Sequence, residues 1–369
     1  MYVLFFIILF LYAILIFRYS IGWRNINISI PTDNSFTPTI SIIIAMRNEE
    51  IEVDRLLKDL SQQIYPTDKL EIIIVNDHST DNTLELLKAQ QIDNLSIINM
   101  GNDEYGKKIA VEKAVELANG EIIVCTDADC SFTPLWIRTI TFYFVNEEIK
   151  LVSGPVNFQK EEGFFHSFQS LEFCSLIGSG AGAIGINNPI FCNGANMAYR
   201  KEVFDQLNNF KNDKVVSGDD VFLLHSVKKR YPKGIAFAKN NNAVVNTPAT
   251  QSLRKFINQR KRWTAKSTSY KDFSSIYTAY VVFLSNLCFI CLLFLAFFDS
   301  SIIKYLIGFY IVKYIVDLFL LVPVIKFFKR KDLIKSILPF ELIYSFYIVL
   351  VVTLSFTTSF EWKGRIHKK

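Results

Sequence analysis

Long apolar blocks lie near the two ends of the chain and flank a central region of mixed composition. Residues 1–17 are apolar and carry no charge, and three further apolar runs lie between residues 277 and 358. About 20 mostly apolar residues are enough to cross a bilayer. The pattern predicts an N-terminal membrane anchor over 1–17, a C-terminal membrane region of two to three spans over 277–358, and a basic tail over 359–369.

The central region alternates short apolar runs with segments of helical period. Four runs are typical of buried strands, and they cover residues 40–45, 72–75, 96–99 and 122–125. The segments between them predict helices: one capped by Asn48 with apolar positions Ile51, Leu56, Leu57 and Leu60, one over 83–88, and one that begins at Gly106. Alternating strands and helices predict a parallel α/β sheet.

The chain after this sheet is less regular. Residues 164–186 combine apolar and aromatic side chains with four glycines, so we expect a helix at the membrane surface followed by a flexible turn region. Asp219 and Asp220 precede an apolar run as at a helix N-terminus, where the helix dipole favours carboxylates. Residues 253–263 are the last soluble element before the C-terminal apolar runs.

Composition supports this division and excludes one class of partner. Half of the 369 residues are hydrophobic, and the formal charge is only +5. Basic residues gather before the second apolar block, where we expect most of them to face anionic lipids; they are Arg254, Lys255, Arg260, Lys261, Arg262, Lys266 and Lys271. No basic surface interleaved with aromatic residues indicates nucleic-acid binding.

The first apolar segment is expected to be an uncleaved anchor. It lacks a basic start and a small-residue cleavage site, which a signal peptide would have. Arg18 and Arg24 follow it and favour a central domain on the cytoplasmic side. The six cysteines agree with a reducing compartment, and we expect Cys288 and Cys291 to serve apolar packing instead of metal or redox chemistry.

Polar clusters follow three of the predicted strands. They are Arg47 with Asn48, Asp77 with Asp81, and Asp127 with Asp129. Right-handed crossovers place the carboxyl ends of parallel strands along one edge of a sheet, where ligands bind. The sequence has no G-x-G-x-x-G stretch and no phosphate loop ending in G-K-[ST], which argues against ordinary dinucleotide and P-loop proteins.

Asp127 and Asp129 form the most informative of these clusters. In an extended chain, residues at i and i+2 point to the same face, and two neighbouring carboxylates repel unless a cation or a proton neutralises them. Mg²⁺ or Mn²⁺ bridging a diphosphate fits, because such hard cations use few protein carboxylates together with phosphate oxygens. Taken alone, the pair also fits a solvated turn or a helix cap.

The ordered set of motifs resembles that of membrane-bound family 2 glycosyltransferases with a GT-A nucleotide-sugar-binding fold, such as cellulose, chitin and hyaluronan synthases and ceramide glucosyltransferases. The motifs are Asp77, Asp127-Ala128-Asp129, Asp219-Asp220 and Gln259-x-x-Arg262-Trp263. The resemblance covers about residues 38 to 272, with a Trp362-Lys363-Gly364-Arg365 tail seen in some members. It implies an α/β GT-A domain flanked by transmembrane helices.

The resemblance also implies roles on the donor side. Asp77 would contact the nucleotide base or ribose, although an ordinary Asx-turn gives the same local pattern. Lys107 would lie near the diphosphate, or it is simply a solvated helix end. Asp127 would lie by the ribose and diphosphate, and Asp129 would hold the metal ion, Mg²⁺ or Mn²⁺. Arg47 and Asn48 join this donor-binding set.

On the acceptor side, Asp220 matches the catalytic base. Asp219 stands where the family often has Glu, and helix capping is the alternative for both residues. Gln259, Arg262 and Trp263 match the motif that covers the diphosphate and the acceptor end; Trp263 alone would also suit an interface anchor. Residues 193–196, with Asn196, match the region that lines the acceptor path.

These residues predict an inverting transfer of a sugar from a nucleotide sugar, with a UDP-sugar as the expected donor, to a lipid-linked or glycan acceptor at the cytoplasmic face of the cell membrane. One base and one in-line attack invert the anomeric centre. The first alternative is the catalytic subunit of a processive polysaccharide synthase. A non-catalytic nucleotide-sugar-binding membrane protein is the alternative of another class, and a transporter is a distant fourth.

The C-terminal membrane region contains a conflict. Residues 302–325 include Lys313 and Asp317, which stand i, i+4 and could pair, and the last apolar run contains Glu341. Three C-terminal passes would place the basic tail outside, against the positive-inside rule. Either one charged segment is re-entrant or interfacial, or the tail breaks the rule.

Overall fold

The computed structural model describes residues 2–28, 36–207, 219–362 and 365–367. The chain forms two compact units. The sheet unit consists of Ile26–Gln159 and Asn187–Pro248, and the helical unit consists of Met1–Asn25, Lys160–Ile186 and Ala249–Lys369. The domain expected over 38–272 contributes residues to both units, and its boundaries stay a prediction.

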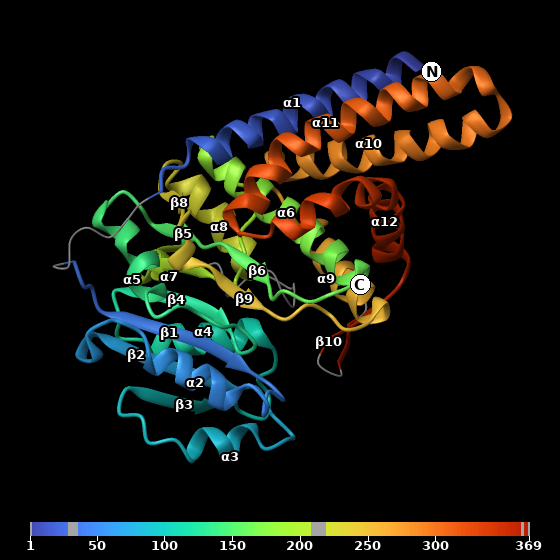
Figure 1. Ribbon diagram of the computed structural model, residues 1–369. Helices are drawn as coiled ribbons and strands as arrows, with labels where there is room; N and C mark the ends of the chain where they lie inside the picture. The colour runs from blue at the N-terminus through green and yellow to red at the C-terminus, as the bar shows by residue number, and fades with distance from the viewer. Residues whose placement is uncertain (1, 29–35, 208–218, 363–364, 368–369) are drawn as a thin grey trace. The chain divides into compact units, whose positions relative to one another are not determined.

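Seven strands form the main sheet of the sheet unit, in the order β3-β2-β1-β4-β7-β5-β8 (Figure 1). Its first four strands pair in parallel: β1 (Ile40–Met46), β2 (Leu70–Asn76), β3 (Leu95–Asn99) and β4 (Ile122–Asp127). These are the four strands that the apolar runs predict. β1, β2 and β4 are almost wholly buried, as expected of strands covered on both faces. The parallel α/β sheet is confirmed.

The other half of the sheet is mixed. β7 (Met197–Arg200) runs antiparallel to both β4 and β5 (Leu151–Ser153), and β5 pairs in parallel with β8 (Ile235–Phe237). β6 (Val156–Phe158) and β9 (Val245–Thr247) form a separate two-stranded parallel sheet. Because Met197 pairs with Cys125, the loop that precedes β7 lies beside the carboxyl end of β4.

Short helices connect these strands. They are α2 (Val53–Ser61), η1 (Thr67–Lys69), α3 (Thr83–Lys88), α4 (Lys107–Leu117), α5 (Trp136–Thr141), η2 (Phe142–Val145), α7 (Lys201–Leu207), α8 (Asp219–Arg230) and η3 (Asn241–Ala243). The expected helices over 83–88, after Gly106 and from Asp219 are confirmed. The expected start of α2 is wrong: Glu52 is its N-cap, and Ile51 lies before the helix with 87% of its surface exposed.

Asn48 has a different local role from the expected cap. Its backbone adopts the left-handed conformation with φ 53°. Its side-chain oxygen accepts a hydrogen bond from the backbone N–H of Thr80 at 2.8 Å. Asn tolerates this conformation because its short polar side chain bonds locally. Asn48 therefore joins the loops after β1 and β2 instead of starting a helix.

The helical unit contains six α-helices among the residues that the structure describes. They are α1 (Tyr2–Asn25), α6 (Phe164–Gly185), α9 (Leu253–Ser267), α10 (Phe273–Phe298), α11 (Ile303–Phe327) and α12 (Ile337–Thr357). Short elements complete the unit: η4 (Ser300–Ile302), η5 (Lys331–Ser336), β10 (Phe360–Trp362) and β11 (Arg365–His367). Four helical stretches are long and apolar enough to cross a membrane: Val3–Asn25, Phe273–Phe298, Ser300–Phe327 and Lys331–Thr357.

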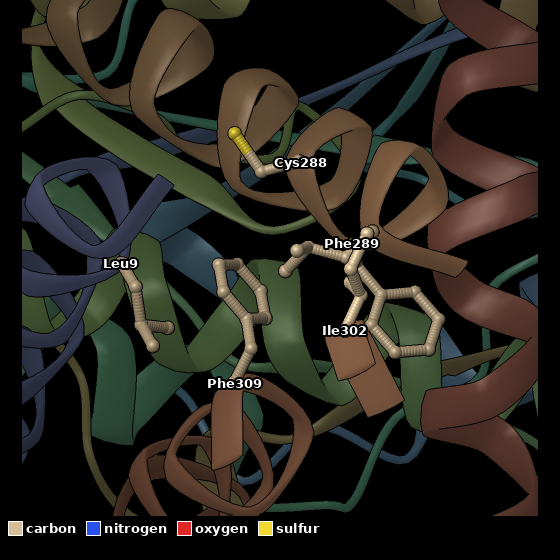
Figure 2. Close-up of a cluster of buried hydrophobic side chains, with 6 residues drawn as sticks. Leu9, Cys288, Phe289, Ile302 and Phe309 are labelled. Atoms are coloured by element: carbon tan, nitrogen blue, oxygen red, sulfur yellow. The ribbon is translucent and has the colours of Figure 1, made fainter. Parts of the chain in front are cut away.

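Helices α1, α10 and α11 lie side by side along their length (Figure 1). Figure 2 shows the buried cluster that joins them, with Leu9 from α1, Cys288 and Phe289 from α10, and Phe309 from α11. Cys288 and Cys291 are free thiols, and Cys288 packs in this apolar cluster as expected from the sequence. This packing buries the inward-facing side chains of the three helices. Many other large apolar side chains on the same helices stay exposed.

Helix α6 corrects the expected turn region. The helix is continuous through Gly178 and Gly182 to Gly185, where the sequence predicts a flexible segment. A Cβ atom at Gly182 would overlap the backbone carbonyl of Tyr19 in α1, and one at Gly178 would lie 2.7 Å from Cγ2 of Val324 in α11. Glycine in a helix between apolar helices permits close backbone approach. These glycines therefore serve helix packing and not chain flexibility.

Charged side chains inside the apolar helices are paired. Lys313 Nζ of α11 lies 2.8 Å from Asp317 Oδ2 and 2.7 Å from Glu341 Oε2 of α12. The hydroxyl of Tyr12 in α1 donates to Asp317 Oδ1 at 2.5 Å. All four groups are buried. The expected Lys313–Asp317 pair is confirmed, and it is part of a network that links α1, α11 and α12.

Candidate active site

The loops after β1 and β2 meet at the carboxyl edge of the parallel strands. Arg47 Nη1 donates to the backbone carbonyl of Asp77 at 2.9 Å, and the backbone N–H of Asn48 donates to Ser79 Oγ at 3.0 Å. Both contacts follow from the parallel register, which sets Met46 opposite Asn76. The predicted convergence of these two polar clusters is confirmed.

Asp77 holds the loop in front of α4. Its Oδ2 accepts from the backbone N–H of Gly106 at 3.1 Å, and its Oδ1 lies 3.1 Å from Nδ1 of His78. Only 2% of the residue is exposed. Gly106 has φ 100°, which a residue with a side chain rarely adopts. Asp77 therefore shapes this loop, and its expected contact with a nucleotide base or ribose stays a prediction.

Lys107 and Asp127 form an ion pair between the start of α4 and the end of β4. Both side chains are partly exposed. Asp127 and Lys107 thus come from different elements. Asp127 lies at the carboxyl end of β4, and the turn at Gly106 brings Lys107 next to it. A cation beside the carboxylate pair is suited to a negatively charged group such as a diphosphate.

Asp127 and Asp129 fit a hard divalent cation by their chemistry. Burial raises the pKa of the Cys130 thiol well above its usual range, and the charges of Asp129 and Asp127 add to this shift. Among the residues that the structure describes, no group of three or more His, Cys, Asp and Glu side chains could by itself hold a metal ion. Mg²⁺ and Mn²⁺ need few protein ligands when phosphate oxygens and water supply the others. The two carboxylates therefore fit a cation held jointly with a bound diphosphate.

Asp220 lies in the first turn of α8, and its carboxylate is oriented by two backbone N–H groups. Gly194 N–H donates to Oδ2 at 3.0 Å, and the N–H of Val221 donates to Oδ1 at 2.8 Å. Gly194 belongs to the loop before β7, which lies beside the end of β4. Asp219 begins the helix, but its side chain and residues 217–218 lie outside the described part of the chain.

Asn196 is a buried support of the sheet unit. Its side chain accepts a hydrogen bond from Trp136 Nε1 at 3.0 Å and donates to the carbonyls of Pro155 and Ala243, each at 2.8 Å. The residue has no exposed surface. This geometry favours a structural role, because its amide is already committed to three partners. Its expected position along an acceptor path has no support from these contacts.

Gln259, Arg262 and Trp263 lie on α9 in the helical unit. Gln259 Oε1 accepts a hydrogen bond from Arg260 Nη1, and the Trp263 ring lies against the Arg260 guanidinium. The other predicted site residues belong to the sheet unit; they include Arg47, Asn48, Asp77, Lys107, Asp127, Asp129, Asn196 and Asp220. The roles implied for all of them stay predictions.

Sequence reasoning gave no individual role to four residues that support these groups. His78 stacks on Tyr105 with ring centroids 4.6 Å apart, next to Asp77. Gly194 orients Asp220, and Glu172 of α6 pairs with Arg260. Glu172 is the one signal that could have been found: it is the only acidic residue between 164 and 186, and such a carboxylate in an apolar helix needs a buried partner.

Comparisons with known proteins bear on the family and the fold of the chain. Residues 41–207 match the family described as glycosyl transferase family 2. The glycosyltransferase AglE of Haloferax volcanii is 25% identical over 222 residues, which cover 58% of this chain and 68% of the relative. The β-monoglucosyldiacylglycerol synthase of a Nostoc species is 31% identical over 118 residues, which cover 31% of this chain and only 25% of the relative.

A solved structure shares the fold along nearly the whole chain. The mannosyltransferase PcManGT of Pyrobaculum calidifontis, in complex with GDP-Man and Mn²⁺, superposes with a TM-score of 0.60. The match covers 95% of each chain at 15% sequence identity. At this identity the likeness concerns the fold alone, and it agrees with the GT-A architecture predicted from the sequence.

Proposed function

We propose that this chain is a family 2 glycosyltransferase of the GT-A fold that moves a sugar from a nucleotide sugar to a lipid-linked acceptor at the cytoplasmic face of a membrane, with inversion. Its residues 41–207 match the family 2 glycosyltransferase domain. One observation carries the proposal. The same chain joins this domain to four helical stretches that are long and apolar enough to cross a bilayer. A membrane-anchored transferase can meet an acceptor that does not leave the bilayer.

The donor side rests on the carboxyl edge of the parallel strands. Lys107 and Asp127 form an ion pair at this edge, and Asp129 follows two residues later. Asp129, with Asp127 beside it, would hold Mg²⁺ or Mn²⁺ together with the diphosphate. The cation would neutralise charge that develops on the leaving diphosphate. We expect a UDP-sugar as donor, with GDP-sugars as the first competitor to test because the mannosyltransferase of similar fold holds GDP-Man.

Asp220 is the proposed general base. The attacking acceptor hydroxyl gives its proton to this carboxylate as its oxygen bonds to the anomeric carbon, and the nucleoside diphosphate leaves from the opposite side with the bonding electron pair. The two backbone N–H groups at Asp220 hold the carboxylate in one orientation. A single displacement with one base inverts the anomeric centre. Lys107, and Arg262 by its family role, would stabilise the leaving diphosphate.

The acceptor side rests on the membrane helices and on α9. Arg18 and Arg24 at the end of α1 favour a cytoplasmic position for the following residues. One relative is named for a reaction that makes a glucosyl lipid, β-monoglucosyldiacylglycerol. The proposed acceptor is therefore a membrane lipid with a free hydroxyl, and the family resemblance implies a role for Gln259, Arg262 and Trp263 at the acceptor and the diphosphate.

A transfer assay tests this function directly. Membranes that contain the protein would receive labelled nucleotide sugars with Mg²⁺ or Mn²⁺, and the product would be separated into extractable lipid and high-mass polymer. Asp220→Asn should lower transfer by about 10²-fold or more, because an amide cannot accept the proton. Nucleotide binding should be largely retained. Asp205→Asn, an exposed carboxylate on α7, is the matched control and should transfer normally.

The arms of this assay separate the alternatives. Label in polymer instead of lipid would favour a processive polysaccharide synthase. Nucleotide-sugar binding without any turnover would favour a non-catalytic binding protein. Full transfer by Asp220→Asn would remove Asp220 from the base role. Undiminished transfer after chelation of divalent cations would contradict the metal site at Asp127 and Asp129.

A further inference from the structure

Arg260 lies inside the Gln259-x-x-Arg262-Trp263 motif, but its side chain points into the helical unit. Only 2% of the residue is exposed. Its Nε lies 2.9 Å from Glu172 Oε1, and its Nη2 lies 2.6 Å from Glu172 Oε2. Glu172 comes from α6 and is 3% exposed. This is a two-point guanidinium–carboxylate pair, which fixes distance and orientation together.

A third helix completes the network. The hydroxyl of Tyr347 in α12 donates to Glu172 Oε1 at 3.0 Å. Tyr347 also stacks on Phe256 of α9 with ring centroids 5.4 Å apart. The carboxylate therefore connects α6, α9 and α12 at one buried point. Moving α9 away from this point would separate a buried charge pair, which is costly because each charge would lose its partner.

Arg260 also contacts two of the three motif residues directly. Its Nη1 donates to Gln259 Oε1. Its guanidinium carbon lies 4.2 Å from the ring centroid of Trp263 and 4.5 Å from that of Phe256. The guanidinium thus pairs with Glu172 and lies over the rings of Trp263 and Phe256. The orientation of Trp263 and Gln259 depends on where Arg260 is held.

We propose that Arg260 is a positioning residue for the transfer reaction: its buried pair with Glu172, supported by Tyr347, holds Gln259 and Trp263 of α9 in their working orientation. The inference rests on the proposed function, because it gives the motif its role at the diphosphate and the acceptor. It adds that the motif is held by the helices of the helical unit, through residues that contact neither substrate.

The test uses the full chain in detergent or nanodiscs. Arg260→Lys keeps the charge but loses the planar, two-point guanidinium. Per folded protein, kcat should fall on the order of tenfold, as for a displaced catalytic group, while the donor KM changes far less. In a Trp263→Ala background, the same change should cost clearly less, because one of the two motif residues that Arg260 holds is already gone.

Tyr347→Phe is a milder second variant that removes only the hydroxyl bonded to Glu172. It should lower kcat by about threefold, and it keeps the test open if Arg260→Lys does not fold. Tyr280→Phe is the matched control, since it removes a hydroxyl from an exposed tyrosine of α10 and should leave kcat unchanged. Amide hydrogen exchange in α9 should be faster in Arg260→Lys and in Tyr347→Phe than in the wild type.

The possible results separate two failures. An unchanged kcat in folded Arg260→Lys, or equal losses with and without Trp263, would overturn the positioning role. Unchanged hydrogen exchange in α9 of Arg260→Lys would contradict the claim that the Arg260–Glu172 pair holds α9 in place. A wild-type protein that transfers no sugar would instead overturn the proposed function, and the exchange measurement would still report whether α9 is held by this pair.

Discussion

At the scale of single residues, two polar side chains that both match family motifs lie in different environments. Asp220 is partly exposed, and its carboxylate is oriented by the N–H groups of Gly194 and Val221. Asn196, only two residues after Gly194, is fully buried, and its side-chain amide forms hydrogen bonds with three partners. A motif match treats these positions alike, whereas burial separates them.

Asn196→Ala should destabilise the protein by about 3 kcal/mol, because buried partners in three different segments lose their hydrogen bonds. Asn193→Ala, in the same loop, loses the hydrogen bond that the Asn193 side chain accepts from the backbone N–H of Ala195, and should cost about 1 kcal/mol or less. Unfolding in mixed micelles measures both. A stable Asn196→Ala protein that is selectively inactive would contradict the structural role and support a contact with the acceptor.

At the scale of elements, helix packing in the helical unit depends on glycine. In α6, a Cβ added at Gly178 would meet α11, and one added at Gly182 would meet α1. A Cβ added at Gly22 of α1 would in turn overlap the backbone carbonyl of Gly182. Helix-weakening residues are tolerated here because close backbone contact offsets their low helix propensity. This contact explains why a glycine-rich segment forms a regular helix.

Gly182→Ala should destabilise the helical unit by about 1–3 kcal/mol, since the added methyl group overlaps the backbone of α1. Gly308→Ala in α11 is the matched control, because nothing lies within 4 Å of its Cβ position. That control should be neutral or stabilising by up to about 1 kcal/mol through helix propensity. Equal stabilities for the two variants would rule out close packing as the reason for Gly182.

At the scale of the whole molecule, the structure bears on the side of the membrane that the C-terminal tail occupies. Lys261 Nζ of α9 donates to the backbone carbonyl of Ser359, just after α12, at 2.7 Å. Since α9 directly precedes α10 in the chain, the end of α12 lies on the side where α10 begins. This contact favours a re-entrant or interfacial α12 over a third C-terminal crossing, an arrangement that would agree with the positive-inside rule.

We therefore expect the tail and the catalytic domain on the same, cytoplasmic side. A cysteine at His367→Cys, in a chain without its native cysteines, should react with an impermeant thiol reagent from the cytoplasmic side of membrane vesicles. A cysteine at Ser300→Cys, between α10 and α11, should react only from the opposite side. Labelling of both positions from one side would contradict this topology.

The sequence by itself determined the elements whose signal is local. Apolar runs of strand length became β1, β2, β3 and β4, runs of membrane length became α1, α10, α11 and α12, and the polar clusters after β1 and β2 met because parallel strands end at one edge. Periodicity and apolar length are properties of neighbouring residues, so they can be counted along the chain.

Tertiary structure alone decided which distant partners these elements received. The continuity of α6 depends on the backbone of α1, the role of Asn196 depends on Trp136, and the orientation of Trp263 depends on Arg260 and its partner Glu172 in another helix. A buried polar or glycine residue gains its role from whichever group lies against it. That choice is set by packing across long sequence separations, which no local pattern records.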